Sequence, residues 1–147
     1  MKLANNIKVS VFVKPEDDED KMKKKFISLF PFDLEKEKIV LQQSKATGFN
    51  QRKVIILEVD LEKERHTRSF LESFVSKLND QQKTMLVSQD NRIDDECNFF
   101  LRLDKQKLLD DEFWITDSGE CFHVKINIAA FPKKKEKAKD VVKEIFS

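Results

Sequence analysis

The sequence predicts an α+β fold in which helices pack on one face of a mainly antiparallel sheet. Two observations predict this class. Several segments alternate apolar and polar residues, with the period of a half-buried strand, and amphipathic helical segments lie between them. The expected order is β-α-β-β-α-α-β-β-α, in a single domain that covers residues 1–147 and is long enough for a substantial core.

The N-terminal part predicts a strand followed by a helix. In residues 7–14, isoleucine and valines alternate with lysines, serine and phenylalanine. Pro15 ends this strand and suits the first position of a helix. The acids at 16–20 and the lysines among residues 21–25 match the helix dipole, and Pro31 ends the helix.

Two further strands and two helices are expected in the middle of the chain. Residues 37–43 and 53–60 predict strands, and a turn that contains Gly48 joins them. Aspartate favours the N-cap position of a helix. We therefore expect Asp60 to cap the helix that follows it and Asp80 to cap a shorter one.

The segment 97–104 is the most informative strand. Its alternation divides the residues between the two faces of a sheet. One face carries Cys97, Phe99, Leu101 and Leu103, and the other carries Asn98, Phe100, Arg102 and Asp104. The first face must pack on a core, while the second places an aromatic ring and a guanidinium where solvent is expected.

The C-terminal part predicts a long strand and a final helix. Residues 105–111 suggest a short helical turn, and residues 113–116 suggest a short strand. Residues 121–128 alternate over their full length, which predicts a strand. Pro132 closes this segment and opens the last helix, which runs to about Phe146.

A basic and aromatic sheet face follows from these strands. When the apolar faces of the three clearest strands are placed against the helices, the opposite face gathers Lys8, Phe12, Lys14, Phe100, Arg102, His123, Lys125 and Asn127. Aromatic rings and arginine planes stack on bases, and lysines contact phosphates, so this composition suits single-stranded RNA. The alternative is a solvated face whose two phenylalanines are covered by a loop or by a second copy of the chain.

Three lysines next to the last helix form a second candidate site. Lys133, Lys134 and Lys135 are expected in its first turn, where the helix dipole disfavours cations. RNA phosphate would turn this cost into a gain, because free N–H groups and ammonium groups would both bind it. The alternative is a solvated lysine run that Glu136 partly offsets.

Several segments together resemble a known family. The resemblance rests on residues 11–16, 62–71, 93–96, 98–106, 122–126 and 131–132, with Leu-Arg-Leu-Asp-Lys-Gln as its most specific run. The family is archaeal, and its members are described as RNA-binding proteins or predicted exosome subunits. The resemblance implies a fold similar to the large-subunit ribosomal protein that binds 5S rRNA. It also places Phe100 where relatives carry a tyrosine, which keeps a stacking ring but loses the phenolic hydrogen bond.

The sequence gives little support for a catalytic site or a metal site. Asp94, Asp95, Glu96 and Asp104 could hold Mg²⁺, but the first three suit a turn before a strand. The sequence has only two glycines, which excludes a P-loop or a dinucleotide fingerprint. Cys97 and Cys121 are expected to be buried free thiols, and the two cysteines and two histidines lack zinc spacing. His66 is expected to be exposed among charged residues, and no cofactor is expected.

These observations favour a non-catalytic RNA-binding protein. The formal net charge of +1 and the 37% of charged residues suit a cytoplasmic protein, and no segment is long enough to span a bilayer. The resemblance adds the exosome, or another archaeal RNA-processing or degradation complex, as an expected partner. The alternative is a structural module that forms a homodimer, or docks to a larger complex, through the same sheet face.

Overall fold

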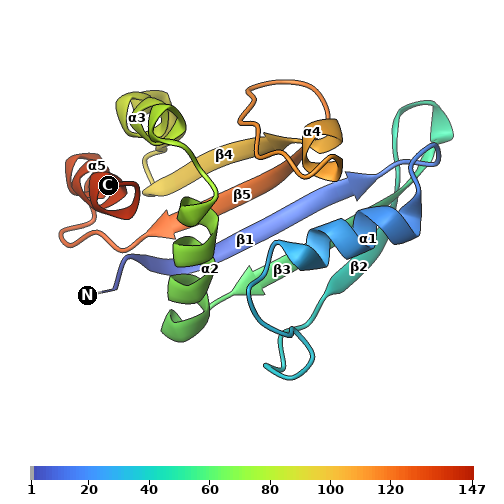
Figure 1. The fold of residues 1–147 in the computed structure, drawn as a ribbon, viewed down its shortest axis with the longest axis horizontal. Helices are drawn as coiled ribbons and strands as arrows, with labels where there is room; N and C mark the ends of the chain where they lie inside the picture. Colours follow the sequence, from blue (N-terminus) through green and yellow to red (C-terminus); the bar gives the residue numbers. More distant parts are fainter. Residues whose placement is uncertain (1) are drawn as a thin grey trace.

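Five strands form one antiparallel sheet in the computed structural model, which describes residues 2–147 apart from the side chain of Phe49. The strands are β1 (Ala4–Val13), β2 (Gln42–Thr47), β3 (Lys53–Leu61), β4 (Asn98–Asp104) and β5 (Cys121–Ile128). Their order across the sheet is β2-β3-β1-β5-β4, with every neighbouring pair antiparallel. Figure 1 views this sheet from the side that the helices cover.

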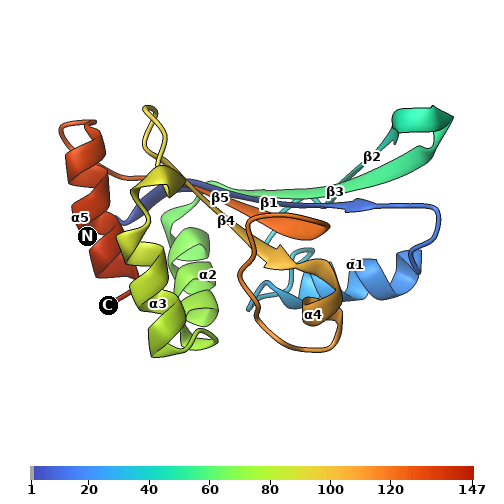
Figure 2. The same ribbon diagram turned by 90° about the horizontal axis from the view of Figure 1, so that it is seen from above.

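The helices gather on one side of the sheet. They are α1 (Glu19–Ser28), α2 (Glu64–Ser76), α3 (Asp80–Ser88), α4 (Lys105–Leu109) and α5 (Lys135–Ile145), with short 3-10 turns at Phe49–Gln51 and Asp90–Arg92. Figure 2 shows α1 to α4 below the sheet, while α5 stands beside the strand ends and starts on the opposite side. The predicted α+β class is confirmed, and the helical turn expected at residues 105–111 forms the short helix α4 between β4 and β5.

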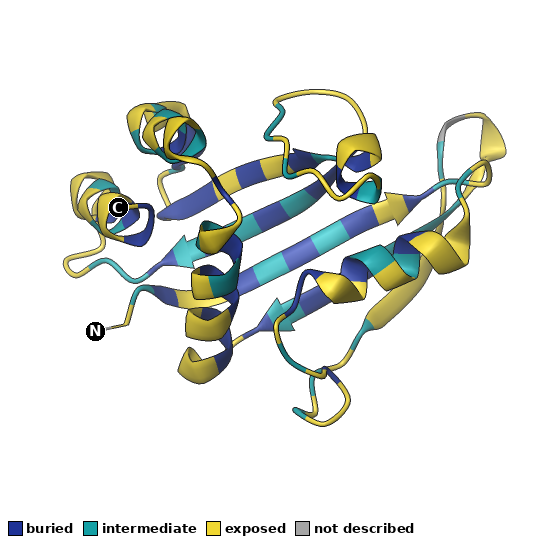
Figure 3. Ribbon diagram, in the orientation of Figure 1, coloured by how far each residue is buried: buried dark blue, intermediate teal, exposed yellow. Residues whose placement is uncertain are grey.

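The core lies between the sheet and these helices. Along β1, β4 and β5 every second residue is buried, as the alternating colours in Figure 3 show. The largest fully buried side chains include Phe26 and Phe70 from the helices and Phe99 and Phe122 from the strands. The strand face that carries Leu101 and Leu103 is therefore the core face, as the alternation predicts.

The start of α1 differs from the expectation. The helix begins at Glu19 rather than at Pro15, because Asp18 is its N-cap and accepts a hydrogen bond from the Lys21 N–H at 3.1 Å. Pro15 lies in a turn that is closed by a 2.8 Å hydrogen bond from the Lys14 N–H to the Asp17 carboxylate. The match between charges and helix dipole holds, since Glu19 occupies the first turn.

The second strand lies further along the chain than expected. Residues 33–39 form turns, in which the Ile39 N–H donates to the Leu34 carbonyl at 2.9 Å. The strand occupies Gln42–Thr47, and all of its residues are exposed. A strand that buries no side chain has no apolar alternation, so the sequence signal fell on the preceding apolar residues, of which Ile39 and Leu41 pack on the core from a loop.

Three helix starts also differ from the expectation. Lys63, not Asp60, is the N-cap of α2 and makes no side-chain capping bond. Asn79, not Asp80, caps α3 through a reciprocal capping box with Gln82. The last helix begins at Lys135, with Lys134 as its N-cap, so the expectation that Pro132 opens it is wrong.

The two edges of the sheet are unequal. β2 pairs with β3 alone among the described strands. The outer edge of β4 is largely occupied, because the carbonyls of Asn98, Phe100 and Arg102 accept hydrogen bonds from Asp94, Arg92 and Thr116. Residues 113–116 supply part of this cover through one bridge between Ile115 and Leu103, and they form no separate strand.

A buried lysine joins three elements at one end of the sheet. The Lys105 Nζ, at the start of α4, donates to the Phe12 carbonyl at 3.0 Å and to the Asp17 carboxylate at 2.9 Å. The side chain is almost completely buried, and Glu120 approaches it at 3.7 Å. Its charge is thus paired inside the protein, and it ties the end of β1 to the entry of α1.

Truncation of a core residue tests the assignment of the two sheet faces. Leu101 is buried on the helix side of β4, so Leu101→Ala removes apolar contacts and leaves a cavity. We expect a loss of about 2–5 kcal/mol in the free energy of unfolding, measured by denaturant titration. A near-neutral effect would mean that the two faces of β4 are assigned the wrong way round.

Candidate nucleic-acid interface

The face of the sheet away from the helices, called the open face below, carries two lysines side by side. In the strand register Lys8 of β1 lies opposite Lys125 of β5, and Lys125 lies opposite Phe100 of β4. Like charges directly opposite each other destabilise a sheet. The Glu58 carboxylate, 3.9 Å from the Lys8 Nζ, offsets part of this repulsion, and an anion bound between the two lysines would relieve it further.

The next row adds a histidine and an arginine. Ser10 of β1 lies opposite His123 of β5, which lies opposite Arg102 of β4. Phe12 follows two residues further along β1, and its ring centroid lies 6.1 Å from that of His123. Phe12 and Phe100 remain 49% and 40% exposed, so each keeps a large part of its ring free for contact.

These side chains surround a shallow hollow of about 360 Å³ on the open face. Its lining includes Lys8, Ser10, Phe12, Phe100, Arg102, His123 and Lys125. The hollow thus combines aromatic rings with cations, which is the combination that binds bases and phosphates together.

His123 is half-buried within this surface. Burial lowers the pKa of His123 below 6.5, and the nearby Arg102 guanidinium lowers it further. The Cys121 Sγ lies 3.6 Å from the His123 Nε2, and burial raises the pKa of this thiol. Both groups are therefore neutral near pH 7, and the positive charge of the hollow comes from Lys8, Lys125 and Arg102.

The structure does not bring every predicted residue into the hollow. Lys14 forms an ion pair with Glu120, and this hydrogen bond raises the pKa of Lys14. Lys133 pairs with Glu96 at 2.9 Å, which raises the pKa of Lys133. Lys134 is the N-cap and Lys135 the first residue of α5. This helix starts on the open-face side of the sheet (Figure 2).

Two acidic residues that sequence reasoning missed border the hollow. Glu58 and Asp60 of β3 lie opposite Ser10 and Lys8, and the Lys8 Nζ lies 3.9 Å from the Glu58 carboxylate. The signal was present in the alternation at the end of this strand, where Glu58 and Asp60 share one face while Leu57 and Val59 share the other. The positive surface therefore ends at β3 and does not extend over the whole sheet.

A family model described as RNA binding matches residues 6–128. The chain belongs to this RNA-binding family. The matched segment contains the residues that line the hollow and stops before Lys133, Lys134 and Lys135. The predicted resemblance to an archaeal RNA-binding family is thus confirmed, while the link to the exosome stays a prediction.

The family relatives match over nearly their full length. A Pyrococcus abyssi protein named as an RNA-binding protein is 25% identical over 142 residues, which cover 96% of this chain and 92% of that protein. An uncharacterized protein from Methanocaldococcus jannaschii is 28% identical over 143 residues, with 95% and 96% covered. The structure of a DUF54 protein from Methanothermobacter thermautotrophicus superposes with a TM-score of 0.79 at 27% identity, covering 99% of both chains.

The acidic run before β4 serves as a turn in this family member. The Asp94 carboxylate accepts the N–H groups of Glu96 and Asn98, each at 2.9 Å. Burial alone would raise the pKa of Asp94, but the hydrogen bonds from Asn98 and Glu96 outweigh it and lower the pKa. Within residues 2–147, no group of three or more histidine, cysteine or acidic side chains could hold a metal ion.

The expectation for His66 is wrong. It is only 3% exposed, its Nε2 lies 3.0 Å from the Glu37 carboxylate, and its ring centroid lies 5.1 Å from that of Phe32. Both contacts of His66 are with residues of the loop before β2. The charge pattern of α2 itself gives no sign of these contacts, because the loop lies far from His66 in the sequence. His66 is thus part of the packing between α2 and this loop.

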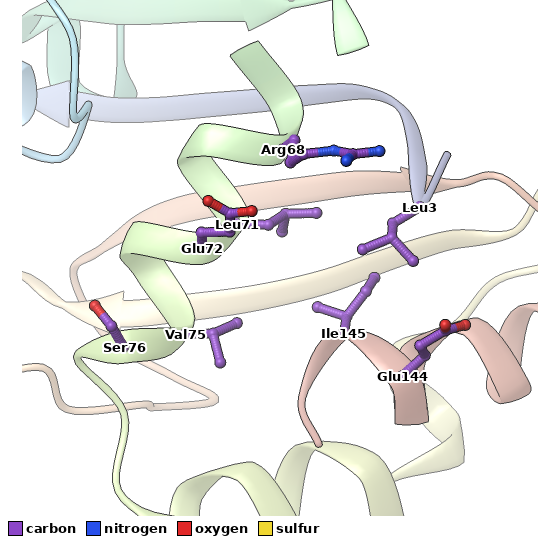
Figure 4. Close-up of a pocket in the computed structure, with 8 residues that line it drawn as sticks. All are labelled: Leu3, Arg68, Leu71, Glu72, Val75, Ser76, Glu144 and Ile145. Atoms are coloured by element: carbon purple, nitrogen blue, oxygen red, sulfur yellow. The ribbon is translucent and has the colours of Figure 1, made fainter. Parts of the chain in front are cut away.

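A second hollow, of about 510 Å³, lies between α2 and α5. Leu3, Leu71, Val75 and Ile145 form its apolar part, while Arg68, Glu72 and Glu144 lie along its border (Figure 4). It contains none of the predicted RNA-binding residues. No helix in the described part of the chain is long and apolar enough to cross a membrane.

The lowered pKa of His123 predicts a pH dependence of stability. Because the folded state favours the neutral ring, the unfolded state binds this proton more tightly. His123 therefore contributes stability that is complete above pH 6.5 and is lost as the pH falls toward the lower pKa of the folded state. In His123→Gln the free energy of unfolding should decline less between neutral and mildly acidic pH. Equal declines in both proteins would contradict the shift, and NMR titration of the ring measures it directly.

Proposed function

We propose that the protein binds RNA through the open face and catalyses no reaction on it. One observation carries the proposal. Two half-exposed phenylalanine rings and three cations surround one hollow, on the sheet face that none of the described helices covers. Membership of an RNA-binding family supports this choice of ligand.

The aromatic rings and the cations of the open face would bind different parts of the RNA. Phe12 and Phe100 offer flat surfaces on which bases can stack, and stacking contributes about 1–3 kcal/mol per base. Lys8, Lys125 and Arg102 attract phosphates, and RNA bound there would also relieve the repulsion between the paired lysines. Affinity should therefore depend on both the rings and the salt concentration.

The partner complex is a separate part of the proposal. We propose that bound RNA connects the protein with an RNA-processing complex, for which the exosome is the candidate that the resemblance suggests. Affinity purification from archaeal cells, with and without ribonuclease, tests this. Loss of the exosome after ribonuclease treatment would indicate a link through RNA, and absence of the exosome from both samples would remove it from the proposal.

Removal of one ring tests the stacking contact. Phe100→Ala should weaken binding of a single-stranded RNA by about 1–3 kcal/mol, because the base loses its partner surface. The melting temperature should change little, since the ring is 40% exposed. Fluorescence anisotropy with labelled RNA gives the affinity.

Trp114→Ala provides the matched control for this variant. Trp114 is 55% exposed, but its ring lies against Lys107 of α4, with the Lys107 Nζ 5.1 Å from the ring centroid. Loss of this aromatic ring should leave RNA affinity unchanged. If Phe100→Ala and Trp114→Ala bind RNA as tightly as the original protein, stacking on the open face is not part of binding.

The lysines before and within α5 are proposed to add a phosphate contact. The triple Lys→Gln variant at positions 133, 134 and 135 should weaken RNA binding and give a shallower dependence of log affinity on log salt. We expect only a small change in thermal stability, because Lys135 alone lies within the helix and Lys133 is paired with Glu96. A triple Lys→Gln variant at the exposed positions 21, 24 and 36 is the control. Identical salt slopes for the two variants would assign these lysines to the solvated surface.

A further inference from the structure

Three rings cross the open face on one diagonal. Phe12 lies on β1, His123 on the neighbouring β5, and Phe100 on β4 beyond it. From Phe12 to His123, and from His123 to Phe100, the line passes to the neighbouring strand and shifts by two residues. The residue opposite His123 is Ser10, two residues before Phe12, and the residue opposite Phe100 is Lys125, two residues after His123. We propose that this diagonal is a track for a single RNA strand, with about one base on each ring. The inference deepens the proposed function and rests on it.

Charged residues border the track in the same order on both sides. On the β1 side Lys125 and Lys8 come first, Asp60 of β3 lies beyond Lys8, and Glu58 of β3 lies opposite Ser10. On the β4 side Arg102 comes first, and Asp104 lies two residues further along at the strand end, where its carboxylate caps α4 by accepting the Lys107 N–H at 2.9 Å. Cations therefore flank the rings and carboxylates lie outside the cations. Phosphates are attracted to the inner positions and repelled from the outer ones, which confines the RNA backbone to the track.

The spacing of the rings selects unpaired RNA. Stacked bases in a duplex strand follow each other at about 3.4 Å. The ring centroids of Phe12 and His123 are 6.1 Å apart, and one strand plus two residues corresponds to about 8 Å between backbone positions. Successive bases can reach successive rings only after they separate from each other. A duplex keeps its bases stacked inside and can offer only its phosphates to Lys8, Lys125 and Arg102.

The test compares a short uridine oligonucleotide with an RNA duplex of similar length, using five variants in fluorescence anisotropy. Phe12→Leu and Phe100→Leu keep apolar bulk on the open face but remove the flat ring. They should weaken single-strand binding about fivefold or more and leave duplex binding unchanged. Lys125→Gln should weaken binding of both ligands. Asp60→Asn should tighten single-strand binding, whereas Asp80→Asn, at the exposed start of α3, should not.

The results distinguish a failure of the proposed RNA track from a failure of the proposed RNA binding through the open face. If Lys125→Gln and both ring variants bind every RNA as the original protein does, RNA binding through the open face is wrong and the track fails with it. If Lys125→Gln weakens binding but the ring variants affect neither ligand, or affect duplex as much as single strand, the open face binds RNA and the track is wrong. Equal effects of Asp60→Asn and Asp80→Asn would overturn the acidic border.

Discussion

The register that joins β1, β5 and β4 is the constraint on which the functional surface depends. Val9 pairs with Val124, and Val124 pairs with Leu101, which places three apolar side chains in the core. The residues next to them in each strand must then point away from the helices. A slip of one residue would bury lysines and expose leucine, so the burial energy that fixes the core also fixes the position of every side chain around the hollow.

Sequence patterns were sufficient where one face of a strand is buried and insufficient elsewhere. The alternation around Leu101 and Val124 placed both faces correctly. The sequence pattern did not predict the position of β2, because none of its side chains is buried. It also predicted too early a start for α5, because the N-cap residue Lys134 makes no side-chain capping bond that the sequence could indicate. The family relationship was visible from short runs of residues, and all of these runs except residues 131–132 lie in the matched segment.

Partners from distant parts of the chain explain what was missed around the site. Glu120 forms an ion pair with Lys14, and Glu96 forms one with Lys133. The Glu37 carboxylate contacts the buried His66 ring. Each contact joins residues far apart in sequence, so local charge patterns do not report it. The open face also gained Glu58 and Asp60 because β3 neighbours β1, a strand order that alternation alone does not determine. The composition of a surface thus depends on topology as much as on pattern.

The unequal edges of the sheet limit how the molecule could assemble through backbone hydrogen bonds. An unpaired edge strand is a template for another strand, and among residues 2–147 no segment covers the outer edge of β2, whereas that of β4 is largely occupied. Pairing of β2 with the β2 of another molecule would use the free edge of both. Sheet extension would then stop at a symmetric pair, because the occupied edge of β4 offers no second template from which a filament could grow.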